Sequence, residues 1–170
     1  MRVKSRARIL LFGSSSEYDK NEKKIREESP LFPSSPYAVS KLAQDYLGLL
    51  YHKAYGLDVI VIRPFFIIGC GKTGDVVSDF VRGIVGIENG NESILRVGKT
   101  DVVRDYLDVK DAIDGVYAIM KHGKSGEIYN LCSGTPTKVG EILNLLIANS
   151  KKKIKVVKSK FRFKNHAEIM

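Results

Sequence analysis

Three short strand-like runs constrain the fold of this chain more than any other feature of its sequence. The runs at 9–12 (ILLF) and 59–62 (VIVI) contain no polar residue, and a third at 126–131 ends in Ile-Tyr-Asn-Leu. Continuous apolar runs of this length are typical of parallel strands buried on both faces, because strands with one solvated face alternate apolar and polar residues. Stretches long enough for helices separate the runs. This alternation predicts an α/β protein built on a parallel sheet.

The stretches between the runs predict four helices and three further strands. Pro36, with Ser34 or Ser35 as the cap, predicts a helix that ends at Gly56. Its apolar residues recur at helical spacing: Val39, Leu42, Ala43, Tyr46, Leu47 and Leu50. Further helices are expected over 75–87, 110–121 and 138–149, and further strands over 94–97, 106–109 and, at a sheet edge, 154–157.

Length and composition are those of one globular domain or little more. The chain has 170 residues, of which 44% are hydrophobic and 28% are charged. These values exclude disorder, collagen and coiled coil, and leave enough apolar material for a core. No apolar run approaches the roughly 18 residues that a membrane span needs, and the N-terminus leads directly into a strand-like run. We therefore expect a soluble, cytoplasmic protein that does not bind membranes.

The net charge of +9 is concentrated at the C-terminus. Residues 151–170 contain eight Lys and Arg against the single acid Glu168, and the middle of the chain is nearly neutral. A basic tail can bind nucleic acid, since Lys and Arg release counterions from phosphates. No aromatic platform, zinc finger or recognition helix accompanies the run, which disfavours a nucleic-acid partner and favours a solvated end.

Neither cysteine nor glycine patterns predict a metal or a phosphate site. Cys70 and Cys132 have no partner at metal-ligand spacing, so we expect packed thiols and no metal. Gly71-Lys72-Thr73 lacks the upstream glycine of a phosphate-binding loop, because Phe66 stands there. The glycines at 69–74 spell G-x-G-x-x-G, but they do not directly follow the first strand as a dinucleotide-binding turn would. A flexible or substrate-facing loop is the better interpretation.

One constellation points to chemistry. Tyr37 and Lys41 are four residues apart near the start of a helix, and therefore lie on one helix face. A nearby ammonium stabilises tyrosinate, which makes the phenol usable as a general acid or base. Ser14, Ser15 and Ser16 follow the first strand, where a hydroxyl could bind the oxygen being oxidised or reduced. The same spacing also occurs by chance in surface helices, so the motif alone leaves both interpretations open.

Five segments resemble the C-terminal part of the extended short-chain dehydrogenase/reductases that act on nucleotide sugars, the NAD-dependent epimerase/dehydratase family. They arrive in family order: Ser14-Ser15-Ser16-Glu17-Tyr18; Ser35-Pro36-Tyr37-Ala38-Val39-Ser40-Lys41; Arg63-Pro64-Phe65 leading to Gly69-Cys70-Gly71; Val103-Arg104-Asp105-Tyr106-Leu107-Asp108-Val109-Lys110-Asp111; and Gly126-Glu127-Ile128-Tyr129-Asn130-Leu131-Cys132-Ser133-Gly134. Among the branches, the sequence is most similar to the GDP-mannose 4,6-dehydratases and the GDP-4-keto-6-deoxy-mannose reductases. The resemblance implies a Rossmann-type doubly wound parallel sheet and a small substrate-binding subdomain.

The resemblance also implies catalytic roles. Tyr37 corresponds to the catalytic acid/base, and Lys41 to its partner, which also holds the nicotinamide ribose; both therefore bind the cofactor, which is NAD or NADP. Ser14, four residues before Tyr18, corresponds to the catalytic hydroxyl, and Ser15 is the second choice and a substrate contact.

Three further residues acquire binding roles by resemblance. Pro64 belongs to the Arg-Pro-Phe segment on the cofactor side. Arg104 corresponds to the arginine that holds the nucleotide diphosphate, for which a guanidinium fork is well suited. The alternative for Arg104 is a surface ion pair with a neighbouring Asp. Arg162 lies where the family often carries an arginine that reaches the nucleotide phosphates, so part of the basic tail would be directed at the substrate.

Departures from the family pattern bear on the reaction. Dehydratases of this family place an acid two residues before the motif tyrosine, where this chain has Ser16, and Glu17 is one residue late. This favours a GDP-4-keto-6-deoxy-mannose reductase, with GDP-mannose 4,6-dehydratase or epimerase as alternatives. Phe66 stands where the family usually has a substrate-binding Asn, and an apolar side chain cannot replace that hydrogen bond.

The Gly-rich βαβ unit that opens such an enzyme has no counterpart here. We expect residues 1–68 to supply later strands and the catalytic helix of the Rossmann-type domain, and residues 69–170 to supply the substrate-binding region, with a core strand returning near 126–131. Without the first unit the strands would leave a sheet edge uncovered. Three explanations compete: a truncated remnant without activity, a split enzyme whose partner chain supplies the N-terminal half, and a module that binds nucleotide sugars without redox chemistry. The family also pairs subunits through the helix that carries Tyr37, so a homodimer is a further possibility.

Overall fold

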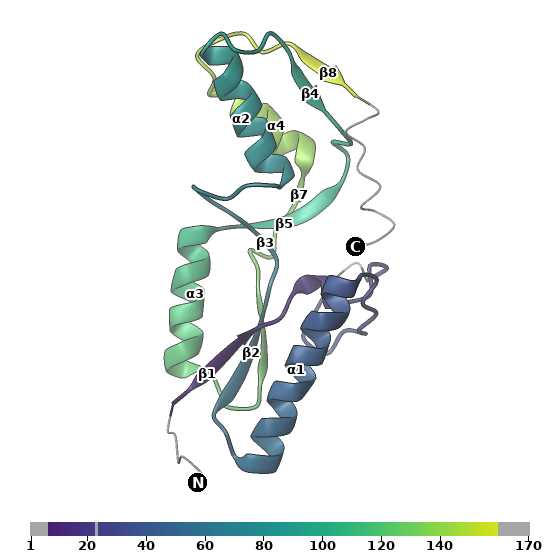
Figure 1. The fold of residues 1–170 in the computed structure, drawn as a ribbon, viewed down its shortest axis with the longest axis vertical. Helices are drawn as coiled ribbons and strands as arrows, with labels where there is room; N and C mark the ends of the chain where they lie inside the picture. Colours follow the sequence, from purple (N-terminus) through teal and green to yellow (C-terminus); the bar gives the residue numbers. More distant parts are fainter. Residues whose placement is uncertain (1–6, 23, 160–170) are drawn as a thin grey trace. The chain divides into compact units, whose positions relative to one another are not determined.

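The computed structural model describes residues 7–22 and 24–159, which form two compact units. Within those residues, unit 1 comprises 7–67 and 107–132, and unit 2 comprises 68–106 and 133–159. The elements are β1 (Ile9–Phe12), the 3-10 turn η1 (Ser15–Glu17), α1 (Pro36–Tyr55), β2 (Val59–Pro64), β3 (Phe66–Ile68), α2 (Val76–Glu88), β4 (Leu95–Val97), β5 (Val103–Asp108), α3 (Val109–His122), β6 (Ile128–Leu131), β7 (Pro136–Lys138), α4 (Val139–Ala148) and β8 (Val156–Lys158) (Figure 1).

The three strand-like runs form one parallel sheet in unit 1, in the order β1-β2-β6. Ile9 pairs with Val59 and Val61 pairs with Ile128, so the central strand is β2, four of whose apolar side chains are at most 2% exposed. On its other side β1 has no strand partner among the described residues, and Ile9 and Phe12 are 37% and 41% exposed. The parallel α/β architecture predicted from the sequence is confirmed.

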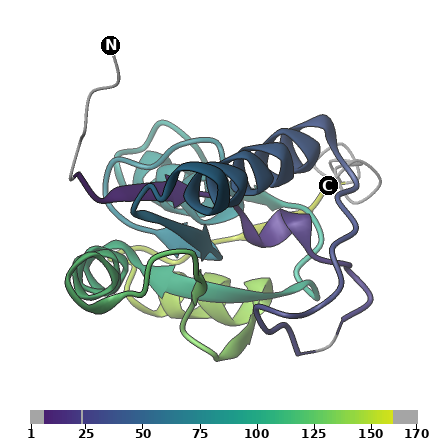
Figure 2. The ribbon, with the colours of Figure 1, turned by 90° about the horizontal axis from the view of Figure 1, so that it is seen from below.

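Helices cover both faces of this sheet, with α1 on one side and α3 on the other (Figures 1 and 2). Side chains alternate between the two faces of a strand. Ile62 therefore packs with Ala112 of α3, while Val59 and Leu11 face Gly48 of α1. A Cβ at Gly48 would collide with the Leu11 side chain, so glycine lets α1 approach the strands closely.

The apolar periodicity of α1 predicts the helix correctly but does not identify its buried face. The helix begins with Pro36 at its first position, and the Ser35 hydroxyl accepts a hydrogen bond from the N–H of Ala38 at 3.1 Å. Its buried residues are Ala38, Asp45 and Gly48. Four of the periodic apolar residues are instead 54–58% exposed, namely Val39, Tyr46, Leu47 and Leu50, which we call the outer face of α1.

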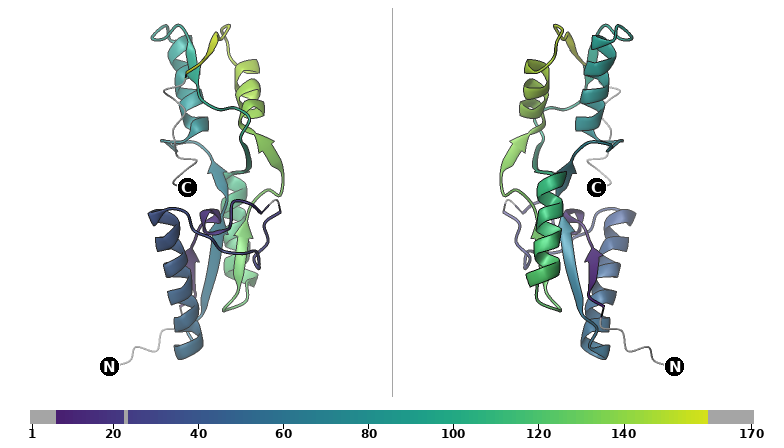
Figure 3. Two further views of the ribbon diagram at one scale, coloured as in Figure 1. Left: turned by 90° about the vertical axis from the view of Figure 1, so that its right-hand side faces the viewer. Right: turned by 90° about the vertical axis from the view of Figure 1, so that its left-hand side faces the viewer.

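Unit 2 has a core of its own. Phe80 and Ile84 of α2 pack with Leu95 of β4 and with Val139 and Leu143 of α4, and the two helices lie side by side (Figure 3). The strand expected at 94–97 is β4, which pairs in parallel with β8, from Leu95↔Val156 to Val97↔Lys158. The antiparallel pair β5 and β7 completes the unit.

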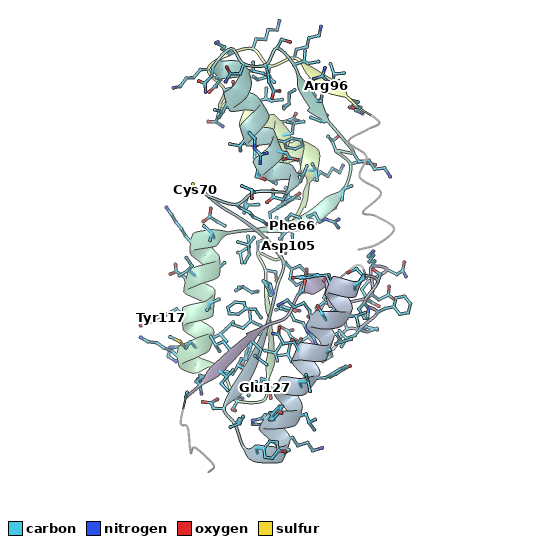
Figure 4. The ribbon with its side chains drawn as sticks, in the orientation of Figure 1. Phe66, Cys70, Arg96, Asp105, Tyr117 and Glu127 are labelled. Carbon is cyan, nitrogen blue, oxygen red and sulfur yellow. The ribbon has the colours of Figure 1, made fainter. Side chains whose placement is uncertain are left out.

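Several local expectations need correction. The strand expected at 106–109 begins earlier, at Val103, and the three-residue strands β3 and β7 were not expected at all. Cys70 and Cys132 are both exposed rather than packed. Cys70 lies on the loop before α2, in which Gly71 and Gly74 have positive φ (Figure 4).

Within 7–22 and 24–159, none of the helices is both long enough and apolar enough to cross a membrane.

Candidate functional site

Residues 13–18 directly follow β1 and form a short, largely buried turn, which we call the serine turn. Ser14 caps η1: its Oγ accepts hydrogen bonds from the N–H of Ser16 at 3.2 Å and from the Oγ of Ser16 at 2.8 Å. The Ser14 side chain is nearly buried, at 9% exposure, and Ser15 is half-buried. Because both hydrogen bonds arrive at the Ser14 oxygen, its own hydrogen remains available for donation.

Lys41 lies beside this turn. Its Nζ donates to the carbonyl oxygen of Phe12, the last residue of β1, at 2.7 Å, and to Oε1 of Gln44 at 3.4 Å. The Gln44 amide donates to the same carbonyl at 3.2 Å. Tyr37 is one helical turn before Lys41 and is 57% exposed, so its phenol is accessible.

Ser14, Lys41 and Pro64 all lie at the carboxyl end of the parallel strands. Phe12 of β1 is in register with Ile62 of β2, and Pro64 ends β2 two residues later. In open α/β sheets, ligands bind outside this edge of the strands. The structure therefore brings Ser14, Lys41 and Pro64 to the part of the fold where a site is expected.

Arg104 belongs to unit 2, in β5, and its side chain is exposed. Its neighbour Asp105, labelled in Figure 4, holds the turn after β6: the carboxylate accepts hydrogen bonds from the backbone N–H groups of Ser133 and Gly134 at 2.8 and 2.7 Å. Asp108 caps α3 by accepting from the Lys110 N–H. Arg162, the remaining predicted contact, lies outside the described residues.

The G-x-G-x-x-G segment does not form a phosphate site. The first turn of α2 follows it, but the Asp75 carboxylate already accepts the N–H groups of Val77 and Ser78, both at 2.9 Å, and pairs with Lys72 at 3.3 Å. A side-chain anion thus occupies the place that a phosphate would take. Among the described residues there is also no cluster of His, Cys, Asp and Glu arranged to hold a metal ion.

Sequence reasoning missed a buried ionic cluster directly behind the serine turn. Arg63 of β2 is 1% exposed, and its Nε lies 2.9 Å from Glu17 Oε2 and 3.0 Å from Asp45 Oδ2; both carboxylates are fully buried. Arg63 Nη1 donates to the Tyr18 hydroxyl at 3.0 Å, which donates to Asn130 of β6 at 2.8 Å. An arginine ending an apolar strand was the available signal, since such a charge needs buried partners.

Burial controls the ionisation of this cluster. It raises the pKa of Glu17 from 4.5 to about 7, helped by the hydrogen bond and the charge of Asp45, while Arg63 and the Ser14 N–H act in the opposite direction. Burial also raises the pKa of Tyr18. For Arg63, burial lowers the pKa, but the hydrogen bonds to Tyr18 and Asp45 outweigh it, so the pKa lies above its ordinary value.

The exposed phenol of Tyr37 and the ammonium of Lys41 are chemically suited to the hydroxyl groups of a nicotinamide ribose. The pyrophosphate and adenosine of a dinucleotide need a glycine-rich turn between a strand and a helix of the same parallel sheet. No such turn occurs among the residues that the structure describes in unit 1. The chain thus offers groups for one end of the cofactor.

The chain is similar to known proteins over most of its length. The family model for GDP-mannose 4,6 dehydratase matches residues 1–169. GDP-6-deoxy-D-mannose reductase from Pseudomonas aeruginosa is 37% identical over 142 residues, which are 82% of this chain and 47% of that protein. The solved structure of RMD from Pseudomonas aeruginosa complexed with NADPH has a TM-score of 0.84 at 35% identity, over 88% of this chain and 52% of that one.

A more distant structure shares the fold. The dTDP-glucose 4,6-dehydratase from Bacillus anthracis in complex with NAD matches with a TM-score of 0.74 at 26% identity, over 89% of this chain and 50% of that chain. The chain spans about half the length of the relatives that it matches. The match to the family model nevertheless extends over nearly all of its residues. The chain belongs to the GDP-mannose 4,6 dehydratase family, within the extended short-chain dehydrogenase/reductases.

Proposed function

We propose that the chain is the catalytic and substrate-binding part of an NAD(P)-dependent nucleotide-sugar oxidoreductase, most like a GDP-4-keto-6-deoxy-mannose reductase. The observation that carries the proposal is the placement of Lys41 Nζ against the end of β1, two residues before Ser14, with Tyr37 one turn away on the same helix. Acid/base tyrosines need such a neighbouring cation and an adjacent hydroxyl.

In the reductive direction each residue has one task. The nicotinamide, when bound, supplies the hydride that reaches C4 of the sugar. Tyr37 gives its phenolic proton to the C4 oxygen, and the Lys41 ammonium stabilises the resulting tyrosinate. Ser14 donates a hydrogen bond to the same oxygen, which is possible because its Oγ accepts from Ser16 and keeps its own hydrogen free. Serine at position 16, in place of an acid, favours reduction or epimerisation over loss of water.

The remaining binding roles follow the division of the sequence. Residues 1–68 carry the catalytic and cofactor side, where Pro64 ends β2 and would contact a bound nicotinamide. Residues 69–170 carry the substrate side, where Arg104 and Arg162 bind the diphosphate of a GDP-linked sugar. Ser15, in the serine turn of residues 1–68, is a further substrate contact. NADPH is favoured over NADH, since the neighbour with the higher identity is an NADPH complex.

Two surfaces support proposals about partners. The open edge of β1 is suited to a further parallel strand from the dinucleotide-binding half, whether that half belongs to the same protein or to a partner chain. The outer face of α1 is suited to a second copy of the chain, because four large apolar side chains are more than half exposed there. Sedimentation should then show a dimer that Leu50→Lys disrupts and Ile113→Lys, on α3, leaves intact.

The test is a titration of the purified chain with NADPH and NADH, followed by nicotinamide fluorescence and thermal unfolding, with and without GDP-mannose. Ligand binding to the folded state raises the unfolding midpoint. Saturable binding of a nicotinamide supports the oxidoreductase. Binding of GDP-mannose without either cofactor supports a split enzyme or a sugar-nucleotide module, and binding of neither would contradict the proposal.

Where turnover is measurable, Tyr37→Phe should abolish the reduction of GDP-4-keto-6-deoxy-mannose while binding of the sugar nucleotide is retained, since the replacement removes only the phenolic hydroxyl and with it the transferable proton. Tyr117→Phe is the matched control. Tyr117 is 52% exposed on the side of α3 that faces away from the strands, and the replacement keeps the aromatic ring on which Lys121 lies at 4.5 Å (Figure 4). Full activity of Tyr37→Phe would refute the assignment.

A further inference from the structure

The buried cluster behind the serine turn contains one more carboxyl group than it has cations. Glu17, Asp45 and Arg63 are all at most 1% exposed, and both carboxyl groups contact the same guanidinium nitrogen. Two carboxylates and one guanidinium would leave a net negative charge inside the protein. An uncompensated buried charge costs several kcal/mol, which the uptake of one proton avoids.

The positions of the carboxyl oxygens agree with a shared proton. A Cβ placed on Gly13 would lie 2.7 Å from both Glu17 Oε1 and Asp45 Oδ1, so the two groups converge on one point. Asp45 Oδ1 is buried and accepts no hydrogen bond from the described residues, and Glu17 Oε2 has its ion-pair contact with Arg63 but no hydrogen bond that meets the geometric criteria. A proton on Glu17 turns its carboxyl group into a donor and can give Asp45 Oδ1 a hydrogen bond.

The cluster also holds the serine turn. Glu17 Oε1 accepts the N–H of Ser14 at 2.6 Å, and Glu17 is the last residue of η1, which Ser14 caps. Through Arg63 the same carboxyl group is fixed to β2, and through Asp45 the arginine is fixed to α1. The turn that carries Ser14 is therefore attached to a strand and a helix by a single set of buried charges.

We propose that Glu17 and Asp45 share one proton at mildly acidic pH and, with Arg63, act as positioning residues that hold the serine turn in the conformation presenting Ser14. Loss of the proton leaves two carboxylates facing each other beside one guanidinium, and their repulsion loosens the hydrogen bond between Glu17 and the Ser14 N–H. The pKa of Glu17, which burial and Asp45 raise to about 7, agrees with this behaviour. The proposal depends on the proposed function only for the role of Ser14.

The other ionisable groups around the cluster do not take over this role. Tyr18 contacts Arg63 through its hydroxyl, and burial raises its pKa above the ordinary tyrosine range, so it stays neutral. Glu27, which acts on Tyr18 through its charge, accepts the backbone N–H of Asn130 at 2.8 Å. Arg63 keeps its charge throughout, because its pKa is raised.

The proton can be observed directly by NMR on the full chain with ¹³C-labelled glutamate carboxyl groups. We expect one glutamate signal with a midpoint near pH 7, absent in Glu17→Gln, and a Ser14 amide resonance that moves with the same midpoint. In Asp45→Asn the titration midpoint of Glu17 should move down by about one pH unit or more, which is a tenfold loss of proton affinity. The reason is that Asp45 no longer repels the Glu17 carboxylate, while Arg63 still attracts it. Glu28→Gln, at an exposed position, should change neither signal.

These measurements need no turnover, so they separate this proposal from the proposed function. A merely structural cluster would not make the Ser14 amide follow a glutamate titration, and Glu17→Gln should keep that amide protected from exchange whereas Glu17→Ala should not. If all glutamates of the wild-type chain titrate below about pH 5, the ordinary range of the residue, the shared proton is refuted. A Ser14 resonance that is independent of pH between 5 and 9 would refute the positioning role even if Glu17 titrates near pH 7.

Discussion

Replacing Glu17 by Gln should remove a specific dependence of stability on pH. Glutamine keeps the size of the side chain and an acceptor for the Ser14 N–H, but it cannot lose a proton. In the wild-type chain the pKa of Glu17 is about 7 in the folded state against 4.5 ordinarily, so the folded state holds its proton more tightly than the unfolded state. The contribution of this proton to the unfolding free energy is fully present below about pH 4.5 and is lost as the pH rises to about 7.

The size of the effect follows from the two pKa values. Each tenfold change in proton affinity is worth about 1.4 kcal/mol, so the rise from 4.5 to about 7 corresponds to roughly 3 kcal/mol of unfolding free energy. The difference in unfolding free energy between the wild-type chain and Glu17→Gln should therefore fall by about that amount between pH 4 and 8. Other carboxyl groups with lowered pKa values, such as Asp58 and Asp75, act equally on both proteins and cancel in the difference.

The assay must report on unit 1 alone, because a chain of two units need not unfold in one step. Urea titrations at several pH values, followed through the amide resonances of Ile60 and Ile62 in β2, meet this condition. Glu28→Gln is the control and should show the wild-type dependence. A difference between wild type and Glu17→Gln that stays constant over this pH range would refute the reasoning.

Three further substitutions test other parts of the structure. Gly13→Ala should lower the unfolding free energy of unit 1 by about 1–3 kcal/mol in urea, because the new Cβ would lie 2.7 Å from the buried carboxyl oxygens of Glu17 and Asp45, which would have to shift. Ser35→Ala should lower the unfolding free energy by about 1 kcal/mol, because it removes the cap of α1. Ser34→Ala should lower it little, since the Ser34 hydroxyl has no hydrogen bond among the described residues. A larger loss in Ser34→Ala than in Ser35→Ala would contradict this assignment of the cap. Arg104→Ala should weaken the binding of GDP-mannose by tenfold or more in calorimetry, because a hydrogen bond to a charged group contributes roughly 1.5–3 kcal/mol. An equal loss of affinity in Arg82→Ala would show that only the general positive charge matters.

The elements that the sequence predicts well are those whose signals are local. The runs at β1 and β2 are apolar without interruption, and the start of α1 carries both a proline and a serine cap, so composition and capping suffice. The strands β3 and β7 have only three residues each, and β7 is Pro-Thr-Lys. Such strands exist because a partner distant in the sequence pairs with them, as Thr137 of β7 pairs with Arg104, and no local pattern records that pairing.

The orientation of α1 shows a second limit. Periodicity identifies an apolar stripe but does not say what the stripe contacts. In this fold the face toward the strands is made of small residues and one carboxylate, Ala38, Gly48 and Asp45, because close approach and a partner for Arg63 matter more there than apolar area. The same limit applies to the candidate site. The sequence identifies Tyr37 and Lys41 because they are neighbours on one helix, whereas the contact of Lys41 with Phe12 exists only in the folded sheet.

The order of the strands in unit 1 also determines when this unit can be completed during synthesis. The sheet needs β6, yet between β2 and β6 the chain passes through the first segment of unit 2 and then α3. On the ribosome β1, α1 and β2 therefore emerge long before their last strand, and one edge of β2 remains unpaired throughout that interval. Contacts between distant segments form slowly, so this interval exposes an apolar strand edge to other chains. The strand order therefore predicts that the nascent chain is prone to association with other chains or with chaperones until β6 is synthesised.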